Sequence, residues 1–378
     1  MAKGEARRPV KVAGNLRRAA HGYRARVSTI ERGPYLERPT LPPDVRARSV
    51  SDLVGAMERT GFQGRKLGEA ARAWEMALRA KGCTVFLGIT GAMVPAGERR
   101  ILAHLITNRF VDVVVSTGAQ VFHDIHEAMG GHHFQGNPAE DDVRLFEHRI
   151  DRMYDVYGSE RAYRETDRLI AGFVDSLDLK RAYSSREFMD LLGAYLIGEG
   201  AARDSVITSA HLSGVPLFLP ALSDSSIGIA LMVARAQGRK ILVDQMQDTD
   251  EVTQITVKSP RTGVVYLGGG VPKNWVNQTE VIADCLGHSV RGHEFAVQFT
   301  TDAPHWGGLS GCTFEEAVSW GKIDPEGAKV QCFVDATIAL PIVAQALFER
   351  LPRNKATRAY PRFGWKKGGL EVTYRKAR

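Results

Sequence analysis

The chain has 378 residues, of which 44% are hydrophobic and 25% charged, and its formal net charge is +7. This composition can form one large core or two ordinary ones, and it argues against general disorder. No apolar run reaches the roughly 18 to 20 residues of a membrane helix, and no apolar stretch follows the basic N-terminus, so we expect neither a membrane span nor a secretory signal.

The four cysteines, Cys83, Cys285, Cys312 and Cys332, lie far apart in the sequence. No pair has the spacing of a zinc knuckle or a redox motif. We therefore expect buried thiols and a cytoplasmic protein.

Positive charge is concentrated at both ends of the chain. Residues 1–50 hold twelve Lys and Arg against four acids, and the residues from Arg350 onward hold ten against one. Such tails can bind nucleic acid or acidic surfaces, but they carry no nucleic-acid motif, so we expect a solvated arm or an oligomer contact. The predicted organisation is a poorly ordered basic arm at 1–45, a single domain at 46–350 and a basic C-terminal tail at 351–378.

The first half of the domain shows strand and helix signals in alternation. Ser51 is expected to cap a helix that runs to Met57, and a second helix is expected at 68–80. An apolar strand at 84–87 is followed by a glycine-containing turn at 90–97, a helix at 98–108 and a second strand at 111–115. This order is typical of a βαβ unit.

Residues 140–200 are more polar and are predicted to be mostly helical, and the alternation then resumes. Further strands are predicted at 216–219, 240–243, 263–267 and 329–334, and helices at 225–236, 271–283, 314–320 and 338–348. The predicted fold is α/β, with one open, Rossmann-like and mostly parallel sheet that has helices on both faces. Binding loops should lie at the carboxyl ends of its strands.

Four loops follow apolar strands as nucleotide-binding loops do, at 90–92, 116–119, 223–225 and 268–270. Glycine allows a backbone to approach a phosphate, and helix N-termini supply N–H donors. None has the usual G-x-G-x-x-G spacing, so each alone also fits a structural turn. Asp224 and Asp335 end apolar runs, where an acid can bind a ribose hydroxyl or cap a helix.

The segment 313–322 is the most distinctive. Thr313 and Glu316 have capping-box spacing, Gly321 is a helix stop, and Lys322 follows beside Trp320. A buried neutral lysine could attack an imine carbon, while an indole could contact an ammonium. An ordinary surface lysine after a capped helix is the alternative.

Four histidines cluster after the second predicted strand: His123, His126, His132 and His133. A metal site is one hypothesis. No carboxylate or cysteine completes a recognisable ligand set, so we expect a polar pocket lining or helix surface and no metal.

Taken together, these segments resemble the deoxyhypusine synthase family. The resemblance rests on residues 316–322, 220–228, 267–271, 330–336 and 113–118, which occur in the family's order and cover about residues 80 to 348. It is closest to a bacterial-type deoxyhypusine synthase-like protein related to homospermidine synthase.

The resemblance implies an NAD-dependent transferase of polyamine metabolism that forms a homotetramer with active sites between subunits. Lys322 would capture an aminobutyl group as an imine and pass it to an acceptor amine. Substrate would be held by Glu316, Trp320, Asn274 and His123. NAD would be held by Thr117, Gly118, Asp224, Gly269, Thr301, Asp302, Asp335 and Ala336.

Several positions depart from the family's pattern. Ile229 and Leu309 replace aspartates that grip spermidine, Asn274 replaces a pocket histidine, and His123 replaces a glutamate. We therefore expect an altered small polyamine substrate, for example putrescine converted to homospermidine. The alternatives are a true deoxyhypusine synthase that modifies a translation factor lysine, a non-catalytic NAD-binding homologue and a plain NAD dehydrogenase.

Overall fold

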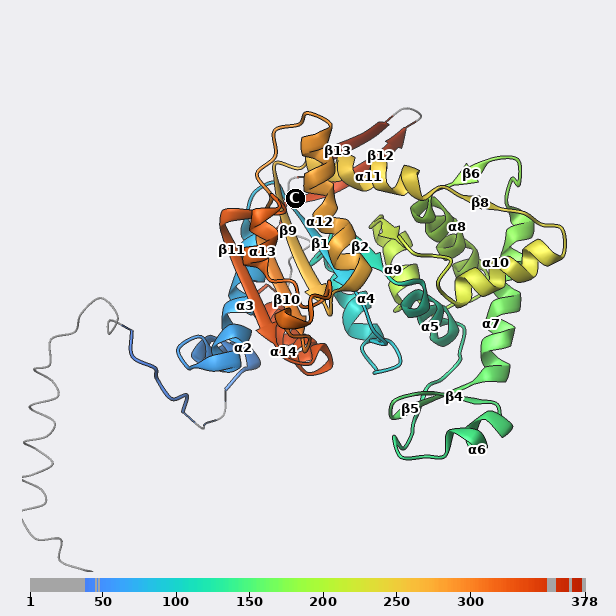
Figure 1. The fold of residues 1–378 in the computed structure, drawn as a ribbon, viewed down its shortest axis with the longest axis horizontal. Helices are drawn as coiled ribbons and strands as arrows, with labels where there is room; N and C mark the ends of the chain where they lie inside the picture. The colour runs from blue at the N-terminus through green and yellow to red at the C-terminus, as the bar shows by residue number, and fades with distance from the viewer. Residues whose placement is uncertain (1–37, 45, 47, 352–357, 367–368, 376–378) are drawn as a thin grey trace, which may run out of the picture. The chain divides into compact units, whose positions relative to one another are not determined.

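The computed structural model describes residues 38–44, 46, 48–351, 358–366 and 369–375 (Figure 1). Residues 1–37 of the predicted basic arm therefore lie outside the described residues, as do 352–357, 367–368 and 376–378 of the predicted tail. The chain divides into two units, Met1–Pro42 and Pro43–Arg378, and the fold below is that of the second unit.

Six parallel strands form the central sheet in the order β11-β10-β9-β1-β2-β7. Their bounds are β1 Cys83–Ile89, β2 Val113–Ser116, β7 Leu217–Phe218, β9 Arg261–Leu267, β10 His293–Thr300 and β11 Ile323–Phe333. The chain first builds outward from β1 through β2 to β7, then returns to β9 and builds the other way. This is the doubly wound order, and its switch point lies between β1 and β9.

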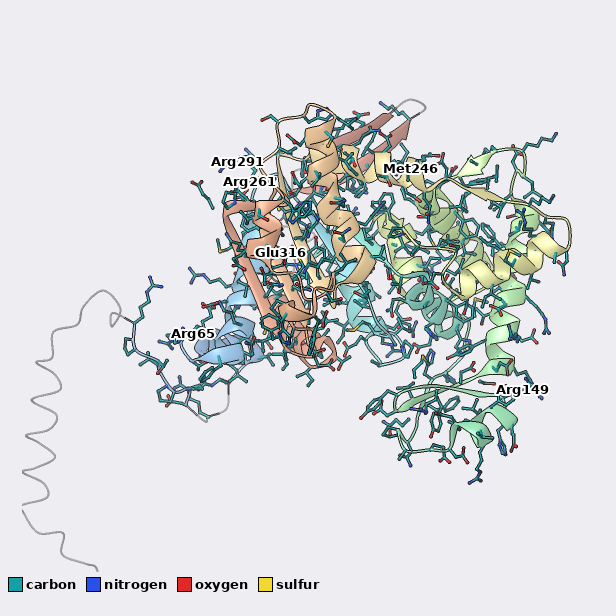
Figure 2. All side chains as sticks on the ribbon, in the orientation of Figure 1. Arg65, Arg149, Met246, Arg261, Arg291 and Glu316 are labelled. Carbon is teal, nitrogen blue, oxygen red and sulfur yellow. The ribbon has the colours of Figure 1, made fainter. Side chains whose placement is uncertain are left out.

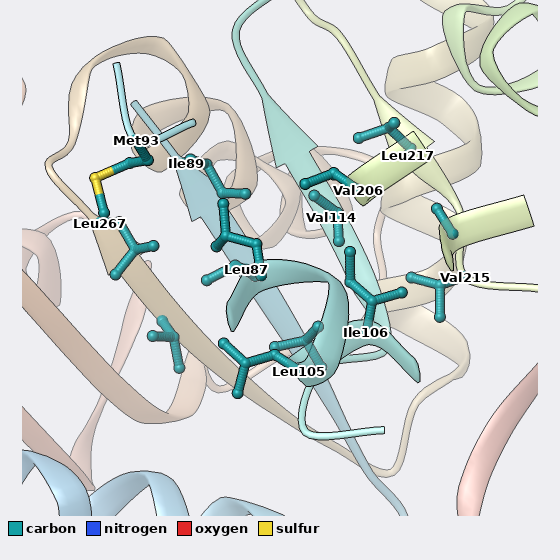
Figure 3. Close-up of a cluster of buried hydrophobic side chains, with 14 of the residues drawn as sticks. Leu87, Ile89, Met93, Leu105, Ile106, Val114, Val206, Val215, Leu217 and Leu267 are labelled. Carbon is teal, nitrogen blue, oxygen red and sulfur yellow. The ribbon is translucent and has the colours of Figure 1, made fainter. Parts of the chain in front are cut away.

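Helices cover both faces of the sheet, as predicted (Figure 1). Successive side chains along β1 point to opposite faces of the sheet. Leu87 joins the core beneath α3 (Phe62–Arg79), α4 (Arg99–Thr107) and α14 (Ala336–Arg350), part of which appears in Figure 3. Phe86 joins the core beneath α11 (Gln245–Lys258) and α12 (Gly270–Cys285).

The remaining elements surround this framework. The helices are α2 Val50–Met57, α5 Gly118–Ala128, α6 Asp142–Glu147, α7 Glu160–Phe173, α8 Ser185–Gly198, α9 Val206–Ser213, α10 Ser226–Ala236 and α13 Phe314–Ser319, with 3-10 turns at Val174–Ser176 and Pro304–Trp306. The short strands are β3 Phe134–Gln135, β4 Ile150–Met153, β5 Val156–Ser159, β6 Ala182–Tyr183 and β8 Leu242–Val243. No helix in the described part of the chain is long and apolar enough to cross a membrane.

Two predicted details are wrong. The strand predicted at 240–243 contributes only β8, which pairs with β6 in a two-stranded sheet outside the central one. The cap of α2 is Ser49, whose Oγ accepts from the Asp52 amide at 3.1 Å, and not Ser51. The stretch at 140–200 is mostly helical, as predicted, and it also contains strands β4 and β5, which pair with β3 in an antiparallel sheet.

Part of the predicted basic tail forms an antiparallel hairpin of β12 (Tyr360–Lys366) and β13 (Gly369–Arg375). Arg358, just before it, is buried and binds the Asp112 carboxylate at 2.7 Å and the Cys83 carbonyl at 2.7 Å. The Trp365 ring lies 3.8 Å from the Arg186 guanidinium carbon. Charge and aromatic packing therefore fix this segment to the domain.

Candidate active site

A cavity of about 1060 Å³ opens at the carboxyl ends of the central strands, on the side of the switch point between β1 and β9. Its walls come from the loops after four strands, from the β4–β5 turn and from the segment 133–136, which contains β3 and is called the strap here. The lining includes residues Thr90 to Met93, Pro95 to Gly97, His133 to Gly136, Met153 to Val156, Gly268 and Gly269, Phe299 to Asp302, Ser310, and Asp335 to Thr337. Ligands of doubly wound folds bind at this position.

The glycine turn after β9 is held tightly against its neighbours. Gly268 and Gly270 have positive φ values of 75° and 54°, where glycine is favoured. A Cβ on Gly269 would lie 2.5 Å from the Ser310 Cα, so this position has no space for a side chain. Thr90 Oγ accepts from the Gly269 amide at 2.8 Å, which ties the turn after β9 to the turn after β1.

The residues predicted to hold NAD fall into two groups. Five line the cavity: Gly269, Thr301, Asp302, Asp335 and Ala336. The other three, Thr117, Gly118 and Asp224, do not line this cavity but lie on the loops that follow β2 and β7. These two loops touch, since a Cβ on Gly118 would lie 2.3 Å from the Ser225 Oγ. Asp335 also caps α14 by accepting from the Thr337 amide at 2.8 Å.

The donor set of the cavity fits a dinucleotide. Asp302 and Asp335 are carboxylates that can accept hydrogen bonds from ribose hydroxyls, and Gly269 lines the cavity with bare backbone. The N-terminus of α14 also points its amides toward this end of the sheet.

Lys322 lies just after α13, where Gly321 ends the helix with a φ of 70°. Its Nζ donates to the Asn274 Oδ1 at 3.2 Å and lies 5.2 Å from the centre of the Trp320 ring. The structure therefore brings together three residues predicted for the site. Glu316, labelled in Figure 2, lies on α13, and its amide donates to the Thr313 Oγ at 3.0 Å, as the capping spacing predicted.

The surroundings of the Lys322 side chain are exposed to solvent on the Trp320 side. Trp320 is 63% exposed, and Trp306 and Leu309 are exposed as well. The Trp320 indole therefore leaves an exposed apolar surface beside the lysine, and α13 carries two acidic side chains, Glu315 and Glu316.

A second lysine, which the sequence did not indicate, lies in the interior beside this site. Lys273 is 2% exposed, and its Nζ donates to the Gln298 Oε1 at 2.9 Å and to the Cys312 carbonyl at 2.6 Å. Burial lowers its pKa to about 8, and the neighbouring Lys322 charge acts in the same direction. Gln298 in turn donates to the carbonyls of Gly268 and Ser310 at 2.7 and 2.8 Å, so this network joins Lys273 to the glycine turn.

His123 lies apart from the Lys322 cluster within this chain. Its Nδ1 is 3.0 Å from His133 Nε2, and His133 Nδ1 is 2.7 Å from Glu127 Oε1. His133 lines the cavity, while His126 is buried and bonds to Thr166 at 3.2 Å. No cluster of metal-ligand type occurs among the described residues.

The strand order and the cavity at the switch point define a Rossmann-like α/β protein. Residues 52–347 match the family model described as deoxyhypusine synthase. The chain belongs to the deoxyhypusine synthase family, a family of transferases that move an aminobutyl group.

The relatives agree with this assignment. The chain is 56% identical over 341 residues to "Probable deoxyhypusine synthase 2" of Methanosarcina mazei, an alignment that covers 90% of this chain and 98% of the relative. It is 35% identical over 320 residues to the "Deoxyhypusine synthase-like protein" of Chlorobaculum tepidum, covering 84% and 91%. A crystal structure from Entamoeba histolytica that carries a deoxyhypusine synthase name has a TM-score of 0.56 at 18% identity, covers 80% and 94%, and shows the shared fold.

Proposed function

We propose that this protein is an NAD-dependent transferase that moves an aminoalkyl group of the aminobutyl type from a polyamine to an acceptor amine through an imine on Lys322. The observation that carries the proposal is the position of the Lys322 Nζ, which lies 3.2 Å from Asn274 and 5.2 Å from the Trp320 ring. An amine nucleophile next to an aromatic face suits capture of a cationic imine.

NAD would be held by the two groups of loop residues described above. The first group lines the cavity and consists of Gly269, Thr301, Asp302, Asp335 and Ala336. The second group consists of Thr117, Gly118 and Asp224. When bound, NAD would accept hydride from the donor amine and return it to the product. The glycine turn at Gly269, which lines the cavity, would lie against the pyrophosphate, and Asp335 and Asp302 would accept hydrogen bonds from ribose hydroxyls.

The chain's own residues would position the amine. Glu316 would pair with an ammonium, Trp320 would contact its charge through the ring face, and Asn274 would hold the Lys322 Nζ by the bond at 3.2 Å. His123, which lies apart from Lys322 within one chain, would face the substrate in a site completed between subunits. By the family resemblance, Ile229 and Leu309, which are both exposed and apolar, stand where relatives carry aspartates that grip spermidine, so they would favour a shorter or less charged amine.

A protein lysine is the second candidate acceptor. The relatives in Methanosarcina are named for deoxyhypusine synthesis, and the exposed Trp320 leaves the side of Lys322 open to a large partner. In either case we propose that the protein is a cytoplasmic homotetramer whose sites are completed between subunits.

The test is a product assay with NAD and a panel of putrescine, spermidine and agmatine, followed by mass spectrometry of the amines and absorbance of NADH. A transferase yields a lengthened amine and no net NADH, whereas a dehydrogenase accumulates NADH. Lys322→Arg should abolish transfer but keep NAD binding, because a guanidinium cannot form the imine. Lys329→Arg, a surface change on β11, is the matched control.

A further inference from the structure

The histidines after β2 form an ordered chain of hydrogen bonds that the Lys322 site does not use. His123 and Glu127 are four residues apart on α5, so they lie on the same face of the helix. His133, from the strap that contains β3, bridges them at 3.0 Å and 2.7 Å. The Arg99 Nε lies 3.0 Å from the other Glu127 oxygen, which fixes the carboxylate.

This geometry dictates where the protons lie. A carboxylate only accepts, so the His133 Nδ1 must donate to Glu127. A neutral His133 then carries its lone pair on Nε2 and accepts from His123 Nδ1–H. His123 is left with a lone pair on Nε2, for which no hydrogen-bond partner is found in the described part of the chain.

We propose that His123, His133 and Glu127 form a proton relay that takes a proton from the donor amine, with His123 as the acceptor and the other two as positioning residues. The proton enters at His123 Nε2, the His123 Nδ1 proton passes to His133 Nε2, and the positive charge then rests on His133 beside Glu127. The relay rests on the proposed function, because an ammonium must lose a proton before the neighbouring carbon can give up hydride to NAD.

The relay explains why two imidazoles are needed. Burial, with the neighbouring His133 and His126, lowers the pKa of His123 to about 3, so His123 alone would hold a proton poorly. Passing the proton to His133 places the charge against a carboxylate at 2.7 Å, where it is stabilised. His133 also lines the cavity, so the relay reaches the cavity wall at His133.

The remaining groups around the pair do not supply a competing charge partner. The titratable and charged side chains packed on the pair or on Glu127 are His126, Tyr163, Arg99 and, through Arg99, Asp204, while His132 interacts with His126. Burial raises the pKa of Tyr163 and lowers that of His126, so both stay neutral at neutral pH. Glu127 is therefore the carboxylate in direct contact with the imidazole pair.

The first test reads tautomers and needs no activity. Solid-state ¹⁵N NMR of the protein labelled at histidine, with His123→Gln and His133→Asn for assignment, should show both residues protonated at Nδ1 near neutral pH. A His133 ring protonated at Nε2 instead would overturn the relay.

The second test separates charge from shape. Glu127→Gln keeps the shape but removes the charge, whereas Glu127→Asp keeps the charge and shortens the side chain. The relay predicts that Gln slows single-turnover NADH formation by about 100-fold or more and that Asp slows it less. A wild-type rate and pH profile in the Gln variant, or a larger loss in the Asp variant, would overturn the relay.

Two controls make the outcomes distinct. His132→Gln changes an exposed histidine outside the relay and should keep the wild-type rate. NAD affinity and the thermal midpoint of each variant report whether the strap has been disturbed. Absence of NADH formation in a single turnover of the wild type, with every amine and no acceptor, would count against the proposed function itself. An active wild type with an unaffected Gln variant would count against the relay alone.

Discussion

Lys273 provides a quantitative test of the interior beside Lys322. Its folded pKa is about 8, whereas the ordinary lysine value is 10.5. A lysine whose pKa is lowered in the folded state is charged more readily when unfolded, so it contributes least stability below pH 8 and most above pH 10.5. Since one pKa unit corresponds to about 1.4 kcal/mol, the full change across this window is about 3 kcal/mol.

The assay is urea unfolding of wild type and Lys273→Met at several pH values between 7 and 11. Other groups titrate in this range, so the quantity of interest is the difference between the two proteins. The unfolding free energy of the wild type should rise relative to that of the variant by up to about 3 kcal/mol as the pH increases. Two parallel curves would show that Lys273 is not held in a desolvated position, which would refute the network described here.

Other predictions concern the framework of the site. Arg358→Met should lower the unfolding free energy by about 3–5 kcal/mol, because it leaves the buried Asp112 carboxylate without its cation. Adding Asp112→Asn should recover part of the loss, and urea unfolding of the single and double variants measures both effects. Gly269→Val should weaken NAD binding at least 10-fold in a fluorescence titration, because a Cβ at Gly269 meets the Ser310 backbone at 2.5 Å. The control Gly287→Ala lies at an open position and should leave NAD binding unchanged. Trp320→Ala should raise KM for the amine more than it lowers kcat, as expected for a binding residue, in steady-state kinetics.

Much of the sheet could be predicted because its strands are apolar runs bounded by glycine. β1, β2 and β9 follow this pattern, and burial on both faces requires it. β10 was missed because polar residues interrupt it. Gln298 and His293 are buried within the strand, where their partners are Lys273 and Thr262. Such partners come from other elements and are not visible in the strand's own sequence.

The candidate site was predictable to the extent that it lies in local motifs. The segment that ends in Lys322 carries its own cap and stop, so its position after a short helix followed from the sequence. Lys273 was not predicted because it lies on a helix with polar residues on several sides, and nothing local shows which side is buried. The contact between His123 and His133 joins a helix to a strap, so it arises only from tertiary structure.

The most direct test of the central claim is a trapping experiment. The purified protein is incubated with NAD and each amine, reduced with borohydride, and digested for peptide mass spectrometry. The proposed mechanism predicts a mass addition on Lys322, whose size identifies the transferred fragment, and none in Lys322→Arg. NAD binding with no adduct on Lys322 for any amine, or an adduct that persists in Lys322→Arg, would contradict it.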